Sequence, residues 1–460
     1  MDCSRLLPAA PSIDGVTRLV VDRGSSDCRL GALAAGEPAW ALGDGVVTVP
    51  VHLLGVIADL VSAAQEQAST AQDRHGRVPA AENQLVQAGL AGRPVVQEIA
   101  ARFRTAVIQA AGTRPLRLLA PWPGDHRWAA GLSHDLDVVS AWPLFTGLRV
   151  TELLRHREFR RAAQAMLSAT ASAFGDPVVA GVDSLLEVET RAGLRSTWFI
   201  LCGNPTARTF LAGDLTYDPG GRRATAILWR LTERAAEIGL HGSFETGRRP
   251  AAFEEQRRRL AALSAPPAAG VRQHFVRLRP GATHGEMARA GFGYDASMGF
   301  ADRNGFRLGA ADVVPAWSTG EGRPLAIDLV PFAWMDRTLS KYSGVEDPEA
   351  WIAQGLDLAR LCREVEGAWA GIWHPNLVPA LGYPGAPEAY AALVEGLRRE
   401  RPWFATHREL VEWRRARRST TAVAIDGQGR VAARATGSGL PALRLESPAG
   451  EPREVVEMQS

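Results

Sequence analysis

Short apolar segments alternate with amphipathic segments of helical length between residues 116 and 418, and no other feature of the sequence constrains the fold as strongly. Strand and helix in regular alternation imply parallel strand pairing through right-handed crossovers, and therefore an α/β domain of the barrel type. In this class, functional side chains collect where strands give way to loops at their carboxyl ends. The predicted strands are 129–132, 196–201, 238–241, 270–276, 326–331 and 370–373, and the predicted helices are 159–173, 222–238, 253–263, 349–366, 387–401 and 403–418.

The segments on either side of this alternating region differ from it in pattern. Residues 1–115 mix short strands with helices, and we expect them to form an N-terminal α/β accessory region. Residues 419–460 contain short strand-like stretches separated by turns, which predicts a small C-terminal β appendage. We therefore assign residues 116–418 to the domain with the alternating pattern. The elements expected in the accessory region are strands 18–22 and 46–51 and helices 54–66 and 95–111.

The composition is ordinary for a globular protein and gives no sign of a nucleic-acid or membrane partner. The chain of 460 residues has a formal net charge of +2 at pH 7, and its basic residues are arginines except for Lys341. The apolar stretch 46–64 contains Pro50, His52 and Asp59, which are costly in a bilayer. We therefore interpret that stretch as protein core and expect no membrane span. The sequence does not indicate an oligomeric state.

Two observations favour the cytoplasm. The four cysteines are scattered without C-x-x-C spacing, which fits reduced thiols better than a disulfide framework or a zinc knuckle. No hydrophobic segment of a signal peptide follows the N-terminal residues, so we expect a cytoplasmic protein.

Two carboxylates stand two residues apart at the end of the first predicted strand of the alternating region. Asp135 and Asp137 project to the same side of the strand. Like charges held this close need a cation, or one of them must bind a proton. A metal held by one carboxylate, with the other left as a base, satisfies both. The alternative is an Asp-rich turn or helix cap.

Further candidate residues follow at the ends of later strands. His241 ends a predicted strand, and a neutral imidazole there is a natural zinc ligand, although a lone histidine is often structural. Arg272 and His274 point to the same side of their strand, and an arginine beside Asp135 would keep that carboxylate ionised. His374 follows the last strand and is a second candidate acid–base histidine.

The order of these motifs resembles the metal-dependent polysaccharide deacetylases, the NodB-homology group within carbohydrate esterase family four. More narrowly, residues 115–415 are similar to a bacterial branch of that group. The shared motifs are LSHDxD at 132–137, GLHGS at 239–243, RQH at 272–274, YDxSxGF at 294–300, GFRxG at 305–309 and WH at 373–374. The resemblance implies a NodB-like irregular (β/α)7 barrel for this part of the chain.

The family's roles carry over to matching positions. The resemblance implies Asp135 as the general base, Asp137 as a metal ligand and His241 as a second ligand. It also implies that Arg272 lies against the base and that His374 protonates the leaving group. The implied cofactor is one divalent metal ion, with zinc favoured.

The third metal ligand departs from the family's pattern. The family's second motif is HxxxH, whereas here Glu245 stands where the second histidine would be. A carboxylate oxygen is a reasonable ligand. His274 occupies a place where most of the family carries proline, and strand geometry aims it inward. We favour His274 and keep Glu245 as the alternative.

Other residues on the expected loop face suggest substrate contacts. Tyr294 and Arg307 follow predicted strands, and Trp334 offers an aromatic floor for a sugar ring. Asp336 beside it could contact the sugar or cap the segment that begins at Arg337.

These observations predict a metal-dependent hydrolase that removes an acetyl or similar acyl group from a carbohydrate or an acylated sugar precursor. One alternative is an amidohydrolase or deformylase that acts on a non-sugar amide. Another is a catalytically impaired deacetylase-fold protein that binds glycans, because the second histidine of HxxxH is missing.

Overall fold

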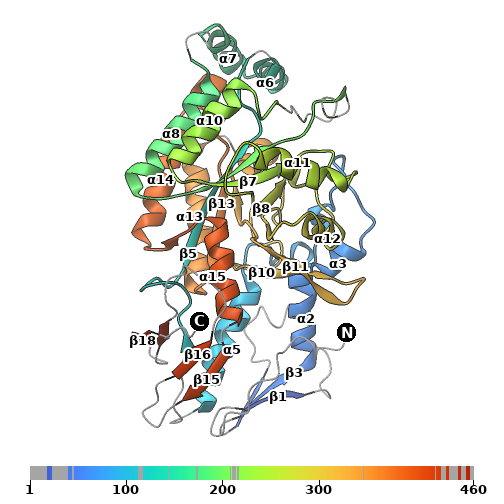
Figure 1. Cartoon of the computed structure of the whole chain (residues 1–460), viewed down its shortest axis with the longest axis vertical. Helices are drawn as coiled ribbons and strands as arrows, with labels where there is room; N and C mark the ends of the chain where they lie inside the picture. The colour runs from blue at the N-terminus through green and yellow to red at the C-terminus, as the bar shows by residue number, and fades with distance from the viewer. Residues whose placement is uncertain are drawn as a thin grey trace.

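A ten-stranded sheet runs through the middle of the molecule and curls into a half-barrel (Figure 1). The structure is a computed structural model that describes residues 18–22, 40–43, 46–111, 118–142, 144–171, 175–207, 209, 214, 217–345, 347–419, 421–425, 431–434, 444–446 and 452–455. The predicted α/β barrel class is confirmed. Among these residues the hydrogen-bonded path is open between its two end strands, β10 and β12.

Neighbouring strands of this sheet are parallel except for the pair β10 and β11. The order is β10-β11-β9-β8-β7-β6-β5-β13-β12, and β14 pairs with β5 beside this path. All eight residues of β5 are buried, as expected for a parallel strand covered on both faces. The strands are β5 (Ala129–Leu136), β6 (Thr197–Leu201), β7 (Glu237–Gly242), β8 (Gly270–Gln273), β9 (Tyr294–Asp295), β10 (Val314–Ser318), β11 (Arg323–Leu329), β12 (Trp334–Met335), β13 (Ala368–Ile372) and β14 (Trp403–Phe404).

Two predicted strands end at least three residues away from their predicted ends. β5 continues to Leu136, four residues past the predicted end. Asp135 therefore lies within the strand, and Asp137 directly follows it. β8 ends at Gln273 rather than at 276 because Phe275 and Val276 have φ angles of 59° and 55°, which a strand cannot accommodate.

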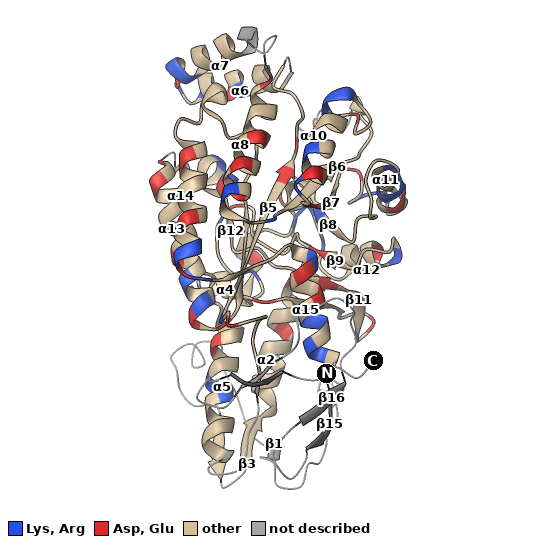
Figure 2. Ribbon diagram, turned by 60° about the vertical axis from the view of Figure 1, so that its left-hand side comes forward, with Lys and Arg blue, Asp and Glu red and all other residues tan. Residues whose placement is uncertain are grey.

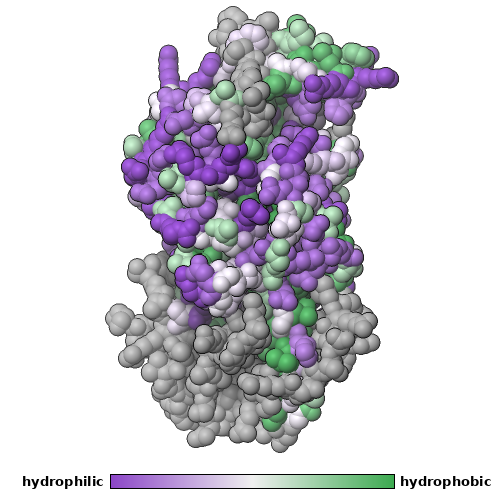
Figure 3. Space-filling view, turned by 90° about the vertical axis from the view of Figure 1, so that its right-hand side faces the viewer, coloured by the Kyte–Doolittle hydropathy of each residue, from purple (hydrophilic) through white to green (hydrophobic). Residues whose placement is uncertain are grey.

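Helices cover the outside of the sheet, and many of their residues are charged (Figure 2). The covering helices include α8 (Pro177–Ala192), α10 (Arg222–Glu233), α11 (Ala251–Ala261), α12 (Ala282–Arg289), α13 (Pro348–Glu364), α14 (Ala386–Arg399) and α15 (His407–Ser419). Helices α6 (Leu144–Arg155) and α7 (Phe159–Ala171) project beyond them at the top of Figure 1. Apolar atoms gather at that top in the space-filling view (Figure 3).

Helix α8 was not expected from the apolar pattern, although its ends carry ordinary signals. The side chain of Asp176 accepts a hydrogen bond from the backbone N–H of Val178 at 3.0 Å, and Pro177 occupies the first turn. Gly193 closes the helix in the left-handed conformation, with φ of 68°. Capping residues therefore define this helix more clearly than its periodicity does.

The described part of the N-terminal region contains a small three-stranded sheet and several helices that reach the half-barrel, including the short α4 (Gln84–Gln87). The sheet order is β1-β3-β2, and a small apolar core joins β3 to α2 and α5. The elements are β1 (Arg18–Asp22), β2 (Ala41–Gly43), β3 (Val46–Pro50), α2 (Val51–Ser62), α3 (Ala64–Ala68) and α5 (Val95–Ala111). None of the described helices is both long and apolar enough to cross a membrane.

The described part of the C-terminal tail consists of short strands, as predicted. β15 (Thr421–Ile425) pairs with β16 (Val431–Arg434), and β17 (Arg444–Glu446) pairs with β18 (Pro452–Val455). β17 also pairs with β4 (Leu118–Leu119). Residues 1–17, 23–39 and the remaining tail residues of the predicted flanking regions lie outside the described residues.

Candidate active site

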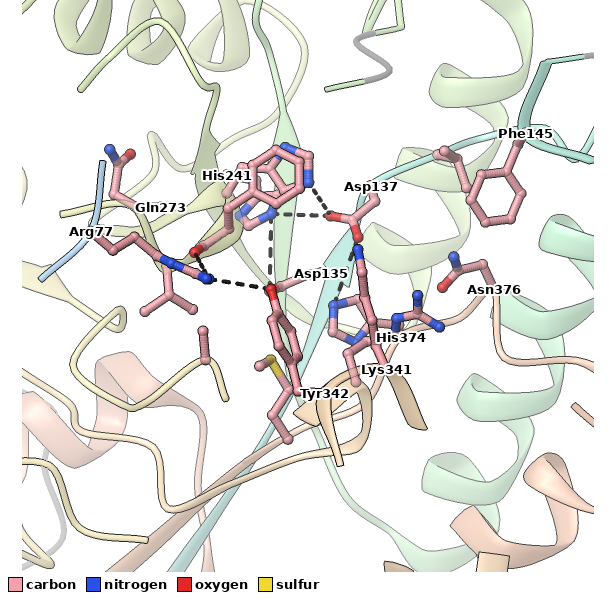
Figure 4. A pocket seen from close by; sticks show the side chains of 17 residues that line it. Arg77, Asp135, Asp137, Phe145, His241, Gln273, Lys341, Tyr342, His374 and Asn376 are labelled. Carbon is pink, nitrogen blue, oxygen red and sulfur yellow. Dashed lines mark hydrogen bonds and ion pairs between the residues drawn. The ribbon is translucent and has the colours of Figure 1, made fainter. Parts of the chain in front are cut away.

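The carboxyl ends of β5, β7, β8 and β13 meet around one pocket, which has a volume of about 150 Å³. Asp135 enters it from β5, Asp137 from the residue after β5, His241 from β7 and His374 from the loop after β13 (Figure 4). His274, directly after β8, also lines the pocket. Polar residues at the carboxyl ends of parallel strands thus converge, as the architecture requires.

Three of these residues form a possible metal site. One ligand atom from each of Asp137, His241 and His274 lies within 4.8 Å of the others. The Nε2 atom of His241 is 3.1 Å from Oδ1 of Asp137, and Nε2 of His274 is 3.5 Å from the same oxygen. A carboxylate and two imidazoles are a donor set that suits zinc and related divalent ions.

The outer nitrogen of each imidazole has a partner that fixes the ring. Nδ1 of His241 lies 3.0 Å from the backbone carbonyl of Arg272, so Nδ1 must carry the proton and the lone pair of Nε2 faces the site. Nδ1 of His274 lies 3.1 Å from Oδ1 of Asp214. Asp214 is itself held by the backbone N–H of Phe244, which donates to Oδ2 at 2.7 Å. Carboxylate–histidine pairs of this kind orient metal ligands.

A strained turn after β8 presents His274 to the site. Phe275 and Val276 adopt positive φ angles, which are costly for residues other than glycine. The N-terminal region supports this turn: Arg77 donates to the carbonyl of Phe275 at 2.9 Å, and the ring of His75 stacks on that of Phe275 with centroids 5.0 Å apart. Phe275 in turn stacks on His274 at 3.9 Å. The loop from residue 73 to 77, which sequence reasoning left without a role, therefore borders the site.

Asp135 is held in its ionised form by a buried arginine. Nη1 of Arg272 donates to Oδ1 of Asp135 at 2.8 Å, and Nη2 donates to Ser133 at 2.9 Å. Burial alone raises the pKa of Asp135, but the charges of Arg272, His241 and His374 outweigh it and hold the pKa below its ordinary value. Asp135 is thus a fixed carboxylate that faces the pocket and lies 3.9 Å from Nε2 of His241.

His374 is paired with a carboxylate on the opposite side of the pocket. Its Nδ1 lies 2.6 Å from Oδ1 of Asp336, and its backbone N–H donates to Oδ2 of Asp336 at 2.6 Å. Burial lowers the pKa of His374, but the charge and hydrogen bond of Asp336 more than offset this and raise the pKa to about 9. The ring is therefore protonated at neutral pH, with Nε2 directed toward Asp137 at 3.7 Å.

The two candidates for the third metal ligand lie in different surroundings. His274 is one of the three converging donors, whereas Glu245 is half-buried, does not line the pocket and lies 4.0 Å from Arg249.

Tyr294, Arg307 and Trp334 were predicted to contact the substrate, but the structure buries all three side chains and none of them lines the pocket. The Tyr294 hydroxyl donates to Glu237 at 2.7 Å. The Arg307 guanidinium pairs with Glu66 of α3, and Trp334 stacks on Trp373 with ring centroids 5.8 Å apart.

Asp336, the fourth predicted substrate contact, is also fully buried and does not line the pocket. Its Oδ1 accepts a hydrogen bond from the backbone N–H of Arg337 at 2.5 Å, as in the capping alternative. Its main contacts, however, are those with His374.

Sequence reasoning missed several residues around the site. Asp214 stands alone between predicted elements, and no spacing links it to His274. Arg77 and Tyr342 reach the pocket from segments far from the motifs. Lys341 also lines the pocket, and its only signal in the sequence is that it is the single lysine.

No protein-family model matches the sequence, and no curated protein matches it. Solved structures do match. One, described as a polysaccharide deacetylase from Mycobacterium smegmatis, has 18% identity, covers 65% of this chain and 93% of its own, and gives a TM-score of 0.44. The PuuE allantoinase has 16% identity, the same coverage of 65% and 93%, and a TM-score of 0.43. A carbohydrate esterase family 4 pseudoenzyme from Bacillus anthracis has 9% identity, covers 62% and 65%, and gives a TM-score of 0.29.

Deacetylases of carbohydrate esterase family 4 are thus among the structures that this chain is similar to. The similarity between this chain and those structures lies in the fold.

Proposed function

We propose that this protein is a metal-dependent hydrolase that removes an acetyl or similar acyl group from a carbohydrate. One observation carries the proposal: three side chains that could hold a metal ion lie between an arginine-paired carboxylate and an aspartate-paired histidine, all facing one pocket. A base and an acid on either side of a Lewis-acid site are the groups that hydrolysis of an amide or ester requires.

The chemistry of the donors fits a divalent ion. Asp137, His241 and His274 would hold it, and the fixed ring orientations of both histidines leave their Nε2 atoms available. We favour zinc on the basis of the oxygen and nitrogen donors. When bound, such an ion supplies Lewis acidity that polarises an acyl carbonyl and lowers the pKa of a water molecule.

Asp135 is the proposed general base. The salt bridge to Arg272 keeps its carboxylate ionised and leaves one oxygen, Oδ2, without that partner. This oxygen accepts the proton of the attacking water. Arg272 acts through Asp135 and is a positioning residue, since its guanidinium is fully buried and spans Asp135, Ser133 and the carbonyl of Ala296.

His374 is the proposed general acid. Its protonated ring faces the pocket across from Asp135, and Asp336 holds both its orientation and its charge. The ring donates its Nε2 proton to the departing amine or alcohol, which leaves as a neutral group.

Acetate release tests this proposal most directly. The purified protein with one equivalent of zinc is expected to release acetate from at least one member of a panel of N-acetylated and O-acetylated sugars and sugar nucleotides. Amide substrates without a sugar, including a formamide, form the comparison arm. Hydrolysis of these alone would favour the amidohydrolase alternative. A zinc-loaded protein that binds glycans but hydrolyses nothing would contradict the proposal.

Asp336→Asn is expected to move the alkaline limb of the pH profile of kcat/KM to lower pH. His374 acts in its protonated form, so activity falls as the pH rises through its pKa of about 9. Removing the charge of Asp336 lowers that pKa, and we expect the limb to shift by about one pH unit or more. Asp302→Asn, at an exposed carboxylate on a nearby loop, is the control and should leave the limb in place. An unshifted limb in Asp336→Asn would remove His374 from the acid role.

A further inference from the structure

One wall of the pocket carries two cations that have no carboxylate within ion-pair distance among the described residues. They are Arg337 and Lys341, and both line the pocket. Figure 4 shows the Lys341 side chain directed toward Asp137 and His374. Lys341 is also the only lysine of the chain, in a protein whose other basic residues are arginines.

None of the ion pairs near this wall includes Arg337 or Lys341. Four nearby carboxylates have their own basic partners at 2.6 to 2.8 Å, whereas Asp137, toward which Lys341 is directed, has only histidine partners at 3.1 to 3.7 Å. The pairs are Asp135 with Arg272, Asp336 with His374, Asp73 with Arg77 and Glu152 with Arg149. Arg337 and Lys341 are therefore the arginine and lysine of this wall that make no ion pair with a described residue.

The two cations are held close together by the local structure. Both belong to the segment around the π-helical turn Thr338–Tyr342. The guanidinium of Arg337 donates to the hydroxyl of Tyr383 and lies 5.6 Å from the centre of that ring, so it cannot swing away. Burial and the charge of Arg337 lower the pKa of Lys341. A pair of partly desolvated like charges is costly unless an anion joins it.

Lys341 also stands where the catalytic pocket meets a second cavity. That cavity has a volume of about 80 Å³ and is lined by Lys341, Arg149, Arg161 and Tyr383, among others. Arg149 and Arg161 are paired with Glu152 and Glu158 at 2.8 and 3.7 Å, so Lys341 is again the unpaired cation. Lys341 thus lines both the catalytic pocket and this second cavity.

We propose that Arg337 and Lys341 bind an anionic group of the substrate, a carboxylate or a phosphate, so that the preferred acyl compound is a negatively charged sugar derivative. This inference rests on the proposed function and specifies its substrate class. Guanidinium and ammonium groups recognise both kinds of anion through charge-assisted hydrogen bonds. A neutral glycan would form no ion pair with either cation.

The test compares N-acetylglucosamine, its 6-phosphate and N-acetylmuramic acid, which are neutral, phosphorylated and carboxylated. For wild-type protein we expect kcat/KM to be at least about tenfold higher for one or both charged compounds, and to fall as salt is added. Lys341→Gln should raise KM for the charged compound about tenfold with little change in kcat, and leave the neutral compound unaffected. Lys341→Arg should restore most of the binding. Arg191→Gln removes an exposed positive charge elsewhere and is the matched control.

Binding of the deacetylated products separates this inference from the proposed function. Calorimetry with glucosamine 6-phosphate, muramic acid and glucosamine needs no turnover. Tighter binding of a charged product that is lost in Lys341→Gln supports the inference even if no acetate is released, and in that case only the proposed hydrolysis fails. Equal binding of charged and neutral products, or binding that Lys341→Gln does not change, would overturn the inference.

Discussion

Asp135→Asn is expected to lower kcat by about 10²–10⁴-fold while the bound metal stays at the wild-type level. Asparagine has the shape of aspartate and can still accept a hydrogen bond from Arg272, which also keeps its bonds to Ser133 and Ala296. It cannot take a proton from water. The measurement is turnover of the best substrate together with metal content, with Asp302→Asn as the control at an exposed carboxylate.

Two results would count against this role for Asp135. Activity within about twofold of wild type would remove it from the mechanism. Loss of metal together with activity would mean that Asp135 acts as a ligand rather than as the base. A thermal unfolding curve close to that of the wild type is needed to show that the loss does not come from misfolding.

Glu66→Gln is expected to destabilise the protein by about 3–5 kcal/mol, because it leaves the buried guanidinium of Arg307 without its counter-charge. The side chains of Glu66 and Arg307 are 3% and 5% exposed. Nε of Arg307 lies 3.1 Å from both carboxylate oxygens, and the amide of Asn83 donates to one of them at 2.8 Å. This network joins α3 of the N-terminal region to the loop that follows β9. The free energy of unfolding in urea measures the effect.

Glu187→Gln is the matched control for that substitution. Glu187 pairs with Arg191 at 3.1 Å, but both side chains are about two-thirds exposed, at 67% and 70%. Exposed pairs of this kind contribute little, and we expect a change below about 0.5 kcal/mol. A similar small change in Glu66→Gln would show that the buried pair does not hold the N-terminal region to the half-barrel.

The half-barrel and the cluster of site residues could be predicted because both are encoded by local patterns. The spacing of Asp135 and Asp137 places both on one side of β5, and Arg272 and His274 share a side at the end of β8. Because the strands are parallel, their carboxyl ends meet at one edge of the sheet, so these residues come together without any further signal in the sequence. The same pattern left the third donor open, because the position of Glu245 depends on how the chain turns after β7.

Residues that support the site from distant segments could not be predicted. Asp214 reaches His274 and Arg77 reaches the turn at Phe275 only through tertiary packing. The strained turn itself has no sequence signal, since neither Phe275 nor Val276 is a residue that favours positive φ.

The burial of the predicted substrate contacts could not be predicted for a related reason. A place near the end of a strand does not determine whether a side chain faces the pocket or the core. Tyr294 and Trp334 are both 1% exposed, and their large apolar rings stabilise the core. Arg307 is buried because Glu66, far away in the sequence, supplies its partner.

Metal content tests the central claim, which is that Asp137, His241 and His274 hold a single divalent ion. Protein purified without chelators and analysed by inductively coupled plasma mass spectrometry is expected to contain about one equivalent of a divalent transition metal per chain. His241→Ala and His274→Ala should each lose it while keeping the circular dichroism of the wild type, and His156→Ala, at an exposed histidine, should retain it. Metal-free wild-type protein that does not take up added zinc, or full occupancy in both ligand variants, would contradict the account.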